Sequence, residues 1–538
     1  MTRSSVDAIR SLTAEVEHNL IHRVNVGDIV SRAAARAARA PAVIDGDRHR
    51  NYGDLESSVN QLANALSARG YGGGDALALV SGNSLEFLQT YYACARLGVV
   101  CVPINLGWRP AEVSYVLSHS RARGVMVESQ LIPWLEPALA EADGVRDVFV
   151  APGVGGEPAA EGIPLDELIA GADSASPACL VGDRDPITYL YTSGTTAAPK
   201  GVVGSHLAVY LESTSVAIDL QLRPDDRVAA LMPLFHTAQL NCFATPVALA
   251  GAALHLMRGF DAAGLLEAIE TERLTVIFAL PMMYRQLLSH PDLERRDLSS
   301  LRLAVYAMAP MPDGDLRRAI DAFGCDFALL FGQTEMSPTT AVFLPEHQLS
   351  HAGAVGTPTR NVQVAIMDDD GSLLPQGESG EIVYRGPHTM EGYLRDQAAT
   401  ARAFEHGWFH SGDNGHFDRD GILWYEDRKK DVIKSGGENV ASLEVEQALY
   451  ADPRIGEVVV IGLPHPRWTE AITAVAVPAA GAELDERAVL ADVRGRLSSF
   501  KVPKALVVVD DLPRTSTGKV QKNVLRERYA DLYASVSS

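Results

Sequence analysis

The pattern of apolar and polar positions predicts repeated strand–helix–strand units over the first two thirds of the chain. One unit has an apolar run at 76–80, helix-like spacing at 84–97 and a second apolar run at 99–104. The same order recurs between positions 303 and 330. Strands that are apolar at every position are typical of parallel sheets covered by helices on both faces. We therefore expect an α/β fold built on doubly wound sheets.

From about Gly353 the pattern changes to short strands separated by turn-forming clusters, as at 368–371. This change predicts a small, β-barrel-like antiparallel unit at the end of a large N-terminal domain. The charged run 426–431 predicts an exposed connector, and the helices and strands after it predict a smaller C-terminal α/β domain. We place the boundary between residues 1–429 and 430–538.

Composition narrows the class of protein. The chain has 538 residues, of which 47% are hydrophobic, enough for at least two domains. A net charge of −21 repels nucleic acid and anionic lipid, so we expect neither as a partner. The five cysteines are scattered without a Cys-x-x-Cys pair, which favours free thiols in a reducing compartment.

The apolar segments do not predict secretion or membrane insertion. The N-terminus lacks the apolar core of a signal peptide. The most apolar segment, 243–257, is shorter than the roughly 20 residues that span a bilayer. We expect a buried helix at this segment, no transmembrane segment and a cytoplasmic protein.

An unusual loop follows the apolar run 187–191. It reads Thr-Ser-Gly-Thr-Thr-Ala-Ala-Pro-Lys-Gly over 192–201. Glycine and small residues let backbone N–H groups approach an anion, and Lys200 adds a positive charge. The loop is not a P-loop, because no Ser or Thr follows the lysine. It predicts a phosphate site, with a polar surface loop as the alternative interpretation.

Two more loops of unusual composition follow predicted strands, at 308–312 and 331–338. Ligands of parallel sheets bind beyond the carboxyl ends of the strands. We therefore expect these two loops and the loop at 192–201 to form one shared site.

The order of further motifs resembles the adenylate-forming superfamily, which includes acyl-CoA synthetases, peptide-synthetase adenylation domains and firefly luciferases. The resemblance extends from Tyr52 to Lys522. After the phosphate loop, the matching blocks are Pro-Leu-Phe-His at 233–236, Phe-Gly-Gln-Thr-Glu at 331–335, Trp-Phe-His-Ser-Gly-Asp at 408–413, Arg-Lys-Lys-Asp at 428–431, Gly-Gly-Glu-Asn-Val at 436–440 and Pro-Arg-Thr-Ser-Thr-Gly-Lys at 513–519. The resemblance implies an adenylation domain at 1–429, which holds ATP and the acid, and a mobile domain at 430–538.

The implied reaction joins a carboxylic acid to AMP with release of pyrophosphate, and then transfers the acyl group to the thiol of CoA with release of AMP. A carboxylate attacks the α-phosphate only with dense positive charge and accurate positioning. The resemblance makes Lys519, Thr334 and Glu335 catalytic, and Glu335 the ligand of Mg²⁺. The residues expected at ATP are Thr192, Ser193, Gly194, Thr195, Thr196, Lys200, Ala309, Pro310, Gln333, Thr334, Asp413, Arg428 and Lys519.

Each of these residues also has an ordinary interpretation when taken alone. Lys519 could be a solvated surface charge, Asp413 a helix cap and Glu335 a paired loop carboxylate. The chain also departs from the family pattern at Ala197, where a glycine is usual, and at Met308, which stands in a block that is often Gly-Gly-Ala-Pro.

The acyl site is expected to be neutral and largely apolar. Relatives that activate amino acids have an aspartate where this chain has His236, so a charged amine would lack a partner. The expected lining is His236, Leu240, Asn241, Phe243, Tyr306, Ala307, Met308 and Met336. We expect a medium-chain or short branched fatty acid, with Met308 as a gauge of chain length. Aryl, cinnamic and steroid side-chain acids remain alternatives.

The second half-reaction is expected to involve rotation of the small domain about Lys430. Gly436 and Gly437 would then let the backbone approach the thiol arm of CoA, and Lys434 would contact either phosphate or that arm. A carrier-protein thiol is the alternative acceptor. A non-catalytic sensor is disfavoured because both Glu335 and Lys519 are present. The sequence also allows a homodimer.

Overall fold

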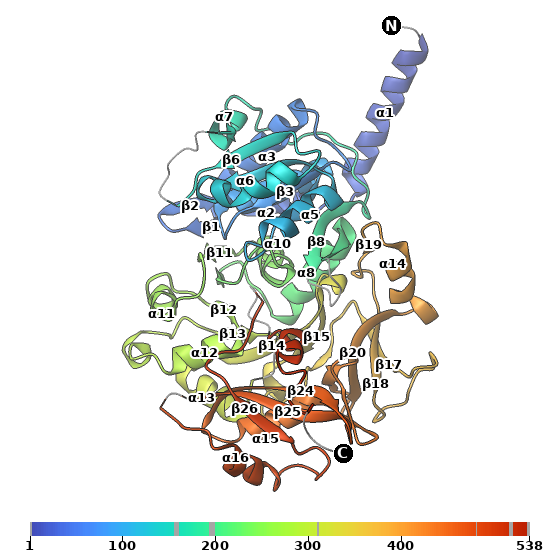
Figure 1. Ribbon diagram of the computed structural model, residues 1–538. Helices are drawn as coiled ribbons and strands as arrows, with labels where there is room; N and C mark the ends of the chain where they lie inside the picture. Colours follow the sequence, from blue (N-terminus) through green and yellow to red (C-terminus); the bar gives the residue numbers. More distant parts are fainter. Residues whose placement is uncertain are drawn as a thin grey trace.

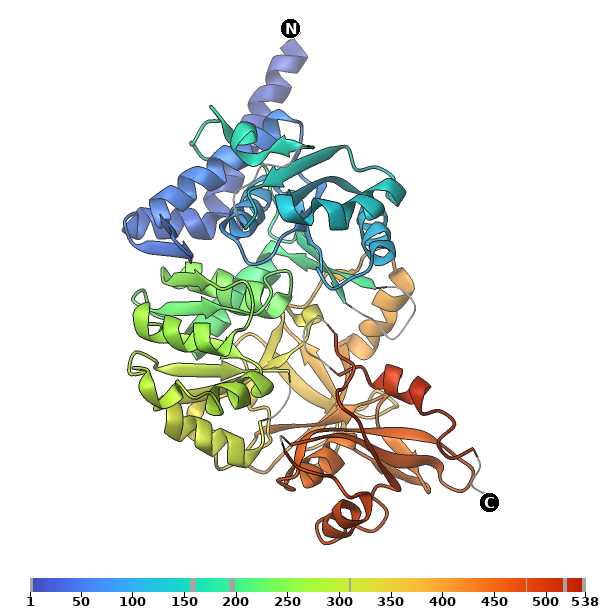
Figure 2. The ribbon, with the colours of Figure 1, turned by 60° about the vertical axis from the view of Figure 1, so that its left-hand side comes forward.

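The computed structural model describes residues 3–154, 161–192, 199–308, 311–479, 481–515 and 520–534. It is a mixed α/β structure with a large N-terminal part and a smaller C-terminal part that lies at one end of it (Figures 1 and 2). The predicted fold class is confirmed. The boundary at residue 430 remains a prediction.

One large sheet forms the middle of the N-terminal part, and its central strands run parallel. In sheet order its strands are β16 (Thr357–Pro358), β15 (Thr339–Phe343), β14 (Asp326–Gly332), β13 (Leu303–Tyr306), β12 (Val276–Ala279), β10 (Arg227–Ala230), β11 (Ala253–Leu256), β1 (Pro41–Asp45) and β2 (Arg48–Asn51). The helices that connect them include α11 (Ala262–Thr271), α12 (Pro281–Leu288) and α13 (Asp313–Phe323).

A second large sheet lies beside the first and contains the strands of the predicted phosphate loop. In sheet order its strands are β19 (Gly392–Tyr393), β9 (Lys200–Ser205), β8 (Pro186–Thr192), β4 (Val100–Pro103), β3 (Ala76–Val80), β5 (Ala122–Glu128), β6 (Asp147–Ala151) and β7 (Ile163–Pro164). Helices of this region are α2 (Asp28–Ala37), α3 (Tyr52–Ala68), α4 (Leu85–Leu97), α5 (Pro110–Ser120), α6 (Ile132–Glu141), α7 (Leu165–Ile169), α8 (His206–Asp219) and α10 (Thr245–Ala250).

The predicted unit at 76–104 forms as expected, for local reasons. The Ser84 hydroxyl accepts a hydrogen bond from the Phe87 amide at 3.0 Å and caps the start of α4. Gly98, with a φ of 71°, ends the helix in the left-handed conformation. Strands β3 and β4 then pair in parallel, and both are buried along their whole length.

The antiparallel unit expected after Gly353 is also present. Its sheet contains β17 (Gln363–Met367), β18 (Gly380–Arg385), β20 (Phe409–Phe417) and β21 (Leu423–Arg428). The short helix α14 (Gln397–Ala403) lies between β19 and β20 in the chain. This sheet faces the C-terminal part of the molecule (Figure 2).

The C-terminal part has its own sheet and its own buried core. The sheet contains β23 (Glu438–Val440), β22 (Ile433–Ser435), β25 (Thr469–Pro478), β24 (Ile455–His465) and β26 (Ala505–Val508). Its helices are α15 (Ser442–Tyr450), α16 (Glu486–Val493) and α17 (Lys522–Arg528).

Two local predictions are wrong. The segment 243–257 is not one helix, because Gly251 adopts a φ of 80° after α10 and the chain continues into β11. The charged run 426–431 is exposed only at Lys429 and Lys430, since its first part lies in β21 and the Asp427 side chain is buried.

The first helix, α1 (Arg3–His22), projects away from the rest of the molecule (Figure 1). None of the described helices is both long and apolar enough to cross a bilayer. The five cysteines are free thiols, as expected from their spacing.

Candidate active site

The predicted phosphate loop connects the two strands of a hairpin. Strands β8 and β9 pair antiparallel, with Thr192 opposite Lys200 at the loop end of the hairpin. Thr192 and Lys200 therefore hold the two ends of the segment 193–198. The expected ATP contacts Ser193, Gly194, Thr195 and Thr196 lie outside the described residues.

Tyr393 brings the lysine of this hairpin together with the expected metal ligand. The Lys200 ammonium lies 4.8 Å from the centre of the Tyr393 ring. The Tyr393 hydroxyl donates a hydrogen bond of 2.9 Å to Oε1 of Glu335. Burial first, and then the Glu335 carboxylate, raise the pKa of the Tyr393 phenol, so it remains a donor at neutral pH. Tyr393 thus contacts both the Lys200 ammonium and the Glu335 carboxylate.

The turn that carries Glu335 depends on a close backbone approach. Gly332 precedes the turn, and a Cβ atom at this position would meet the Pro338 carbonyl oxygen at 1.9 Å. The Gln333 amide donates to the same oxygen at 2.9 Å. The glycine allows the backbone to fold back, and Thr334 and Glu335 follow on a short helical turn with partly exposed side chains.

Glu335 fits a magnesium site. Mg²⁺ is usually held by one or two carboxylates together with phosphate oxygens and water. Glu335 is partly exposed and forms no ion pair within the described ranges. When bound, the metal supplies positive charge that screens the phosphates. Glu335 would hold it, with one carboxylate oxygen oriented by Tyr393.

Asp413 and Arg428 form an ion pair in the site. They are opposite each other in the register of β20 and β21, and Arg428 Nε lies 3.0 Å from Asp413 Oδ1. Burial opposes the charge of Arg428, but Asp413 and also Glu335 raise the pKa of its guanidinium. Arg428 therefore lies in the field of both carboxylates, and the expected ribose and metal residues are close together.

The expected acyl segment borders a small cavity of about 10 Å³. Of the predicted lining residues, His236 and Met308 contact it. Met308 has a φ of 74° and is 45% exposed, so its side chain lies at the edge of the protein surface. Burial lowers the pKa of His236 to about 4, and the ring is therefore neutral at pH 7.

Other predicted acyl residues do not line this cavity. Phe243 stacks on Phe278 with ring centres 4.6 Å apart, so it lies behind a lining residue. The Tyr306 hydroxyl donates instead to Gln348 at 2.7 Å. The remaining four are Leu240, Asn241, Ala307 and Met336, all buried. Ala309 and Pro310, expected at the adenine, lie outside the described residues.

The sequence interpretation missed residues beside Glu335 and residues that line the acyl cavity. Tyr393 is the second residue of a Gly-Tyr pair that forms no recognisable motif, and no signal in the sequence indicates its contact with Glu335. The cavity is also lined by Met232, Pro233, Ala238, Gln239 and Phe278. Phe278 could have been found, because it lies near the carboxyl end of the parallel strand β12.

The predicted hinge residue, Lys430, is exposed, and a buried or half-buried aspartate forms a polar contact on either side of it in the chain. The buried Asp427 carboxylate accepts a hydrogen bond from the Ser442 amide at 2.6 Å, which links β21 to α15. On the other side Arg526 of α17 pairs with Asp431 at 2.8 Å. Of these two contacts, the Asp427–Ser442 hydrogen bond joins the two sides of Lys430, whereas Asp431 and Arg526 both lie after it.

The expected catalytic lysine, Lys519, lies outside the described residues. The two ends of its segment are described, because Arg514 and Val520 form an antiparallel bridge. Lys434 is exposed, and its amide donates to Glu470 at 2.7 Å.

Gly436 and Gly437 have φ values of 64° and 90°, conformations that L side chains rarely adopt. Both glycines are exposed. Their conformation agrees with an exposed, tightly turned backbone at this position.

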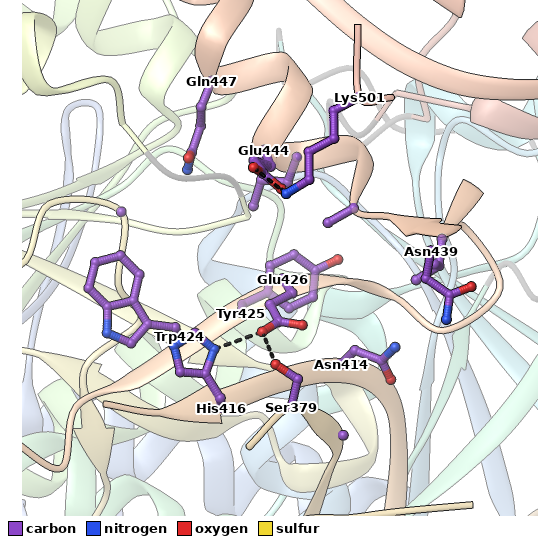
Figure 3. Close-up of a pocket in the computed structure, with 15 residues that line it drawn as sticks. Ser379, Asn414, His416, Trp424, Tyr425, Glu426, Asn439, Glu444, Gln447 and Lys501 are labelled. Atoms are coloured by element: carbon purple, nitrogen blue, oxygen red, sulfur yellow. Dashed lines mark hydrogen bonds and ion pairs between the residues drawn. The ribbon is translucent and has the colours of Figure 1, made fainter. Parts of the chain in front are cut away.

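A larger cavity of about 560 Å³ lies between the antiparallel sheet and α15. His416, Trp424 and Glu426 line it from the sheet, and Glu444 and Lys501 line it from the C-terminal part (Figure 3). Asn414 and Tyr425 also line this cavity, whereas Glu335, Asp413 and Arg428 do not. The cavity is therefore bordered by neighbours of the Asp413–Arg428 pair but not by the pair itself.

Comparison with known proteins identifies the family. The profile of the AMP-binding enzyme family matches residues 30–394, and that of the AMP-binding enzyme C-terminal domain matches 444–519. The chain is 36% identical over 498 residues to feruloyl-CoA synthase of an Amycolatopsis species, covering 93% of this chain and 98% of the relative. It is 34% identical over 508 residues to the long-chain-fatty-acid–CoA ligase FadD13 of Mycobacterium tuberculosis, covering 94% and 99%.

The solved structures agree with these relatives. ATP-bound MatB from Rhodopseudomonas palustris superposes with a TM-score of 0.86 at 30% identity, covering 95% of this chain and 100% of that one. The chain therefore belongs to the AMP-binding enzyme family. Within it, the chain is an AMP-forming acid–thiol ligase of the acyl-CoA synthetase branch, which uses ATP, Mg²⁺ and CoA.

Proposed function

We propose that this ligase activates a compact carboxylic acid and transfers its acyl group to CoA. The observation that supports a compact acid is the stacked pair of Phe278 and Phe243, which bounds the cavity beside His236 on one side. The two named relatives act on acids of different size, so their names do not select one. Medium-chain or branched fatty acids and aryl or cinnamic acids both fit this description.

In the first half-reaction the described residues hold ATP. Thr192 and Lys200 position the phosphate loop, and Lys200 provides positive charge beside the β- and γ-phosphates. Asp413 accepts hydrogen bonds from the ribose hydroxyls, and Arg428 holds that carboxylate in place. Thr334 donates to the α-phosphate. These roles rest on the family resemblance and on the convergence of Glu335, Tyr393 and Arg428.

The substrate acid and Lys519 of the C-terminal part complete the first half-reaction. The neutral His236 ring borders the acyl cavity without adding charge, which suits an uncharged acyl body. Lys519 bridges the attacking carboxylate and the α-phosphate as negative charge builds up there. Removal of such a preorganised cation typically costs on the order of 10²–10³ in rate.

In the second half-reaction the C-terminal part rotates about Lys430. The exposed pair Gly436 and Gly437 then forms a narrow passage for the thiol arm of CoA. Breaking the Asp427–Ser442 hydrogen bond is part of this rotation, because its two partners lie on opposite sides of Lys430.

The test is release of AMP across a panel of acids, with and without CoA. A CoA-dependent thioester of a compact acid supports the proposal. Exchange of pyrophosphate into ATP with one acid, without any CoA thioester, contradicts it and favours a carrier protein as acceptor. The Lys519→Ala variant provides the internal control, since it should fold normally and lose formation of the acyl-adenylate.

A further inference from the structure

Gln239 places an unpaired polar atom in the wall of the acyl cavity. Its side chain is fully buried and lines the cavity beside His236. The Met232 amide donates to Gln239 Oε1 at 3.2 Å, which fixes the orientation of the side-chain amide. Nε2 then has no partner among the described residues. A buried N–H without a partner is destabilising, because it has lost its hydrogen bonds to water. Such a group in a substrate cavity indicates a ligand atom that accepts its hydrogen bond.

A buried carboxyl group lies behind the same segment. Glu212 of α8 is fully buried, and its Oε1 accepts a hydrogen bond from the Thr339 hydroxyl at 2.9 Å. The Thr339 hydroxyl is also 3.1 Å from Cys242 Sγ. Within the described ranges Oε2 has no hydrogen-bond partner, and no Lys, Arg or His pairs with the group. Burial raises the pKa of Glu212 well above its usual range, which favours the protonated form of the carboxyl group.

The chain directly after Gln239 has an unusual backbone. Residues Leu240–Ala244 form a π-helical turn, which is rare and often marks a functional site. Cys242 on this turn contacts Thr339, the partner of Glu212. Asn241 on the same turn has a buried Oδ1 without a partner among the described residues. Gln239, Asn241 and Glu212 thus give the back of the acyl site both donors and acceptors.

The size of the cavity makes this polar region accessible to a bound acid. A volume of about 10 Å³ holds no organic acid, so binding has to displace the side chains that close it. Beyond the lining residue Gln239, the buried Cys242 contacts Thr339, which in turn donates a hydrogen bond to Glu212. An acid that enlarges the cavity past Gln239 and Cys242 would reach the Thr339–Glu212 pair.

We propose that Gln239 and Glu212 form a polar subsite in the acyl site, and that the acid activated by this ligase carries a hydroxyl or another oxygen away from its carboxylate. The inference rests on the proposed function and restricts the proposed substrates to oxygenated acids. Gln239 donates its free N–H to the substituent oxygen, and the Glu212 carboxyl group, whose Oε2 has no partner among the described residues, pairs with a hydroxyl. A hydrocarbon acid leaves both groups unpaired. The subsite therefore favours an oxygenated acid over the hydrocarbon chain that the sequence suggested.

The first test compares matched acids on the unmodified enzyme. Suitable pairs are 4-hydroxycinnamic and cinnamic acid, 3-(4-hydroxyphenyl)propionic and 3-phenylpropionic acid, and 8-hydroxyoctanoic and octanoic acid. For at least one pair, kcat/KM for CoA-dependent AMP release should favour the oxygenated acid by about tenfold or more, because a site built to pair a hydroxyl rejects analogues without it. Equal or lower values for every oxygenated acid overturn the inference.

Two variants locate the subsite. Gln239→Met and Glu212→Leu should each reduce the ratio between oxygenated and hydrocarbon acids toward one, with an unchanged KM for ATP. Glu212→Gln keeps both a donor and an acceptor and should retain most of the preference. A purely structural role would instead lower the melting temperature and leave the ratio unchanged, which contradicts the inference. If no acid yields AMP and a CoA thioester, the proposed function itself fails, and this outcome differs from equal activity on both members of a pair.

Discussion

The Tyr393 hydroxyl donates a hydrogen bond of 2.9 Å to Glu335, the residue expected to bind magnesium. Tyr393 belongs to the short strand β19, which pairs with β9 next to Lys200. The orientation of the metal ligand therefore depends on a strand that lies nearly 60 residues further along the chain. The same strand also fixes the distance between the ligand and the phosphate-loop lysine.

The first prediction concerns this hydrogen bond. Tyr393→Phe removes the donor and leaves Glu335 less well oriented, so KM for MgATP should rise by about tenfold, the equivalent of one hydrogen bond of ~1.4 kcal/mol to a charged group. Pyrophosphate exchange measured at several Mg²⁺ concentrations checks it. Tyr210→Phe, on the partly exposed side of α8, is the matched control. An unchanged magnesium dependence in Tyr393→Phe would contradict the role given to this tyrosine.

A second prediction concerns the ribose pair. Asp413→Asn weakens the acceptor for the ribose hydroxyls and removes the charge that holds Arg428, so kcat/KM for ATP should fall by about 10–100-fold, as expected for hydrogen bonds to a charged group. Asp420→Asn changes a carboxylate that is 75% exposed and serves as the control. Adenylation rates measured with saturating acid distinguish the two variants. Equal rates in both would argue against ATP binding at Asp413.

The hinge gives a third prediction. Lys430→Pro restricts the backbone at the position about which the C-terminal part is proposed to rotate. Pyrophosphate exchange should remain close to the unmodified rate, while CoA thioester formation should fall by about tenfold or more. Lys430→Ala removes the same charge but leaves the backbone free, and both half-reactions should survive. Parallel loss of the two half-reactions in Lys430→Pro would speak against a rotation at this residue.

A fourth prediction concerns stability and pH. His388 is fully buried, and burial lowers its pKa from 6.5 to about 4. As the pH falls below 6.5, the unfolded chain binds a proton that the folded chain cannot accept. The free energy of unfolding therefore decreases between pH 6.5 and about 4, by up to about 1.4 kcal/mol per pH unit for this group. The full contribution is present above pH 6.5.

Urea denaturation from pH 7 to pH 5 tests this prediction. His388→Leu should reduce the slope of stability against pH, whereas His18→Leu, at an exposed position on α1, should not change it. Identical slopes in the His388 variant and the unmodified protein would show that His388 does not titrate as proposed.

The parts of the fold that the sequence predicts are those with local causes. The unit at 76–104 is marked by a Ser84 cap, a Gly98 end and strands that are apolar throughout. The segment 243–257 was misinterpreted because its apolar composition continues through Gly251, where the backbone turns. A glycine near the end of a helical pattern is a recognised stop signal, so this error could have been avoided.

In the candidate site, too, the sequence predicts the residues that belong to a motif and misses those placed by tertiary structure. Asp413 and Arg428 were found by motif, and their pairing follows from the register of adjacent strands. The lining of the acyl cavity could not be derived in this way. Which side chains of residues 239–243 face the cavity depends on the π-helical turn, and a turn of that kind leaves no periodic signal in the sequence. Tyr393 was missed because its contact depends on tertiary pairing with β9.

The larger cavity beside Trp424 has walls that belong to opposite sides of Lys430 (Figure 3). Turning about that residue pulls the walls apart, so this space exists only while α15 covers the antiparallel sheet. A small molecule bound between Trp424 and Glu444 would slow the catalytic cycle, because it would hold the C-terminal part in this arrangement. It would need no likeness to the nucleotide, the acid or the thiol, and a substrate would oppose it only by favouring the rotated arrangement.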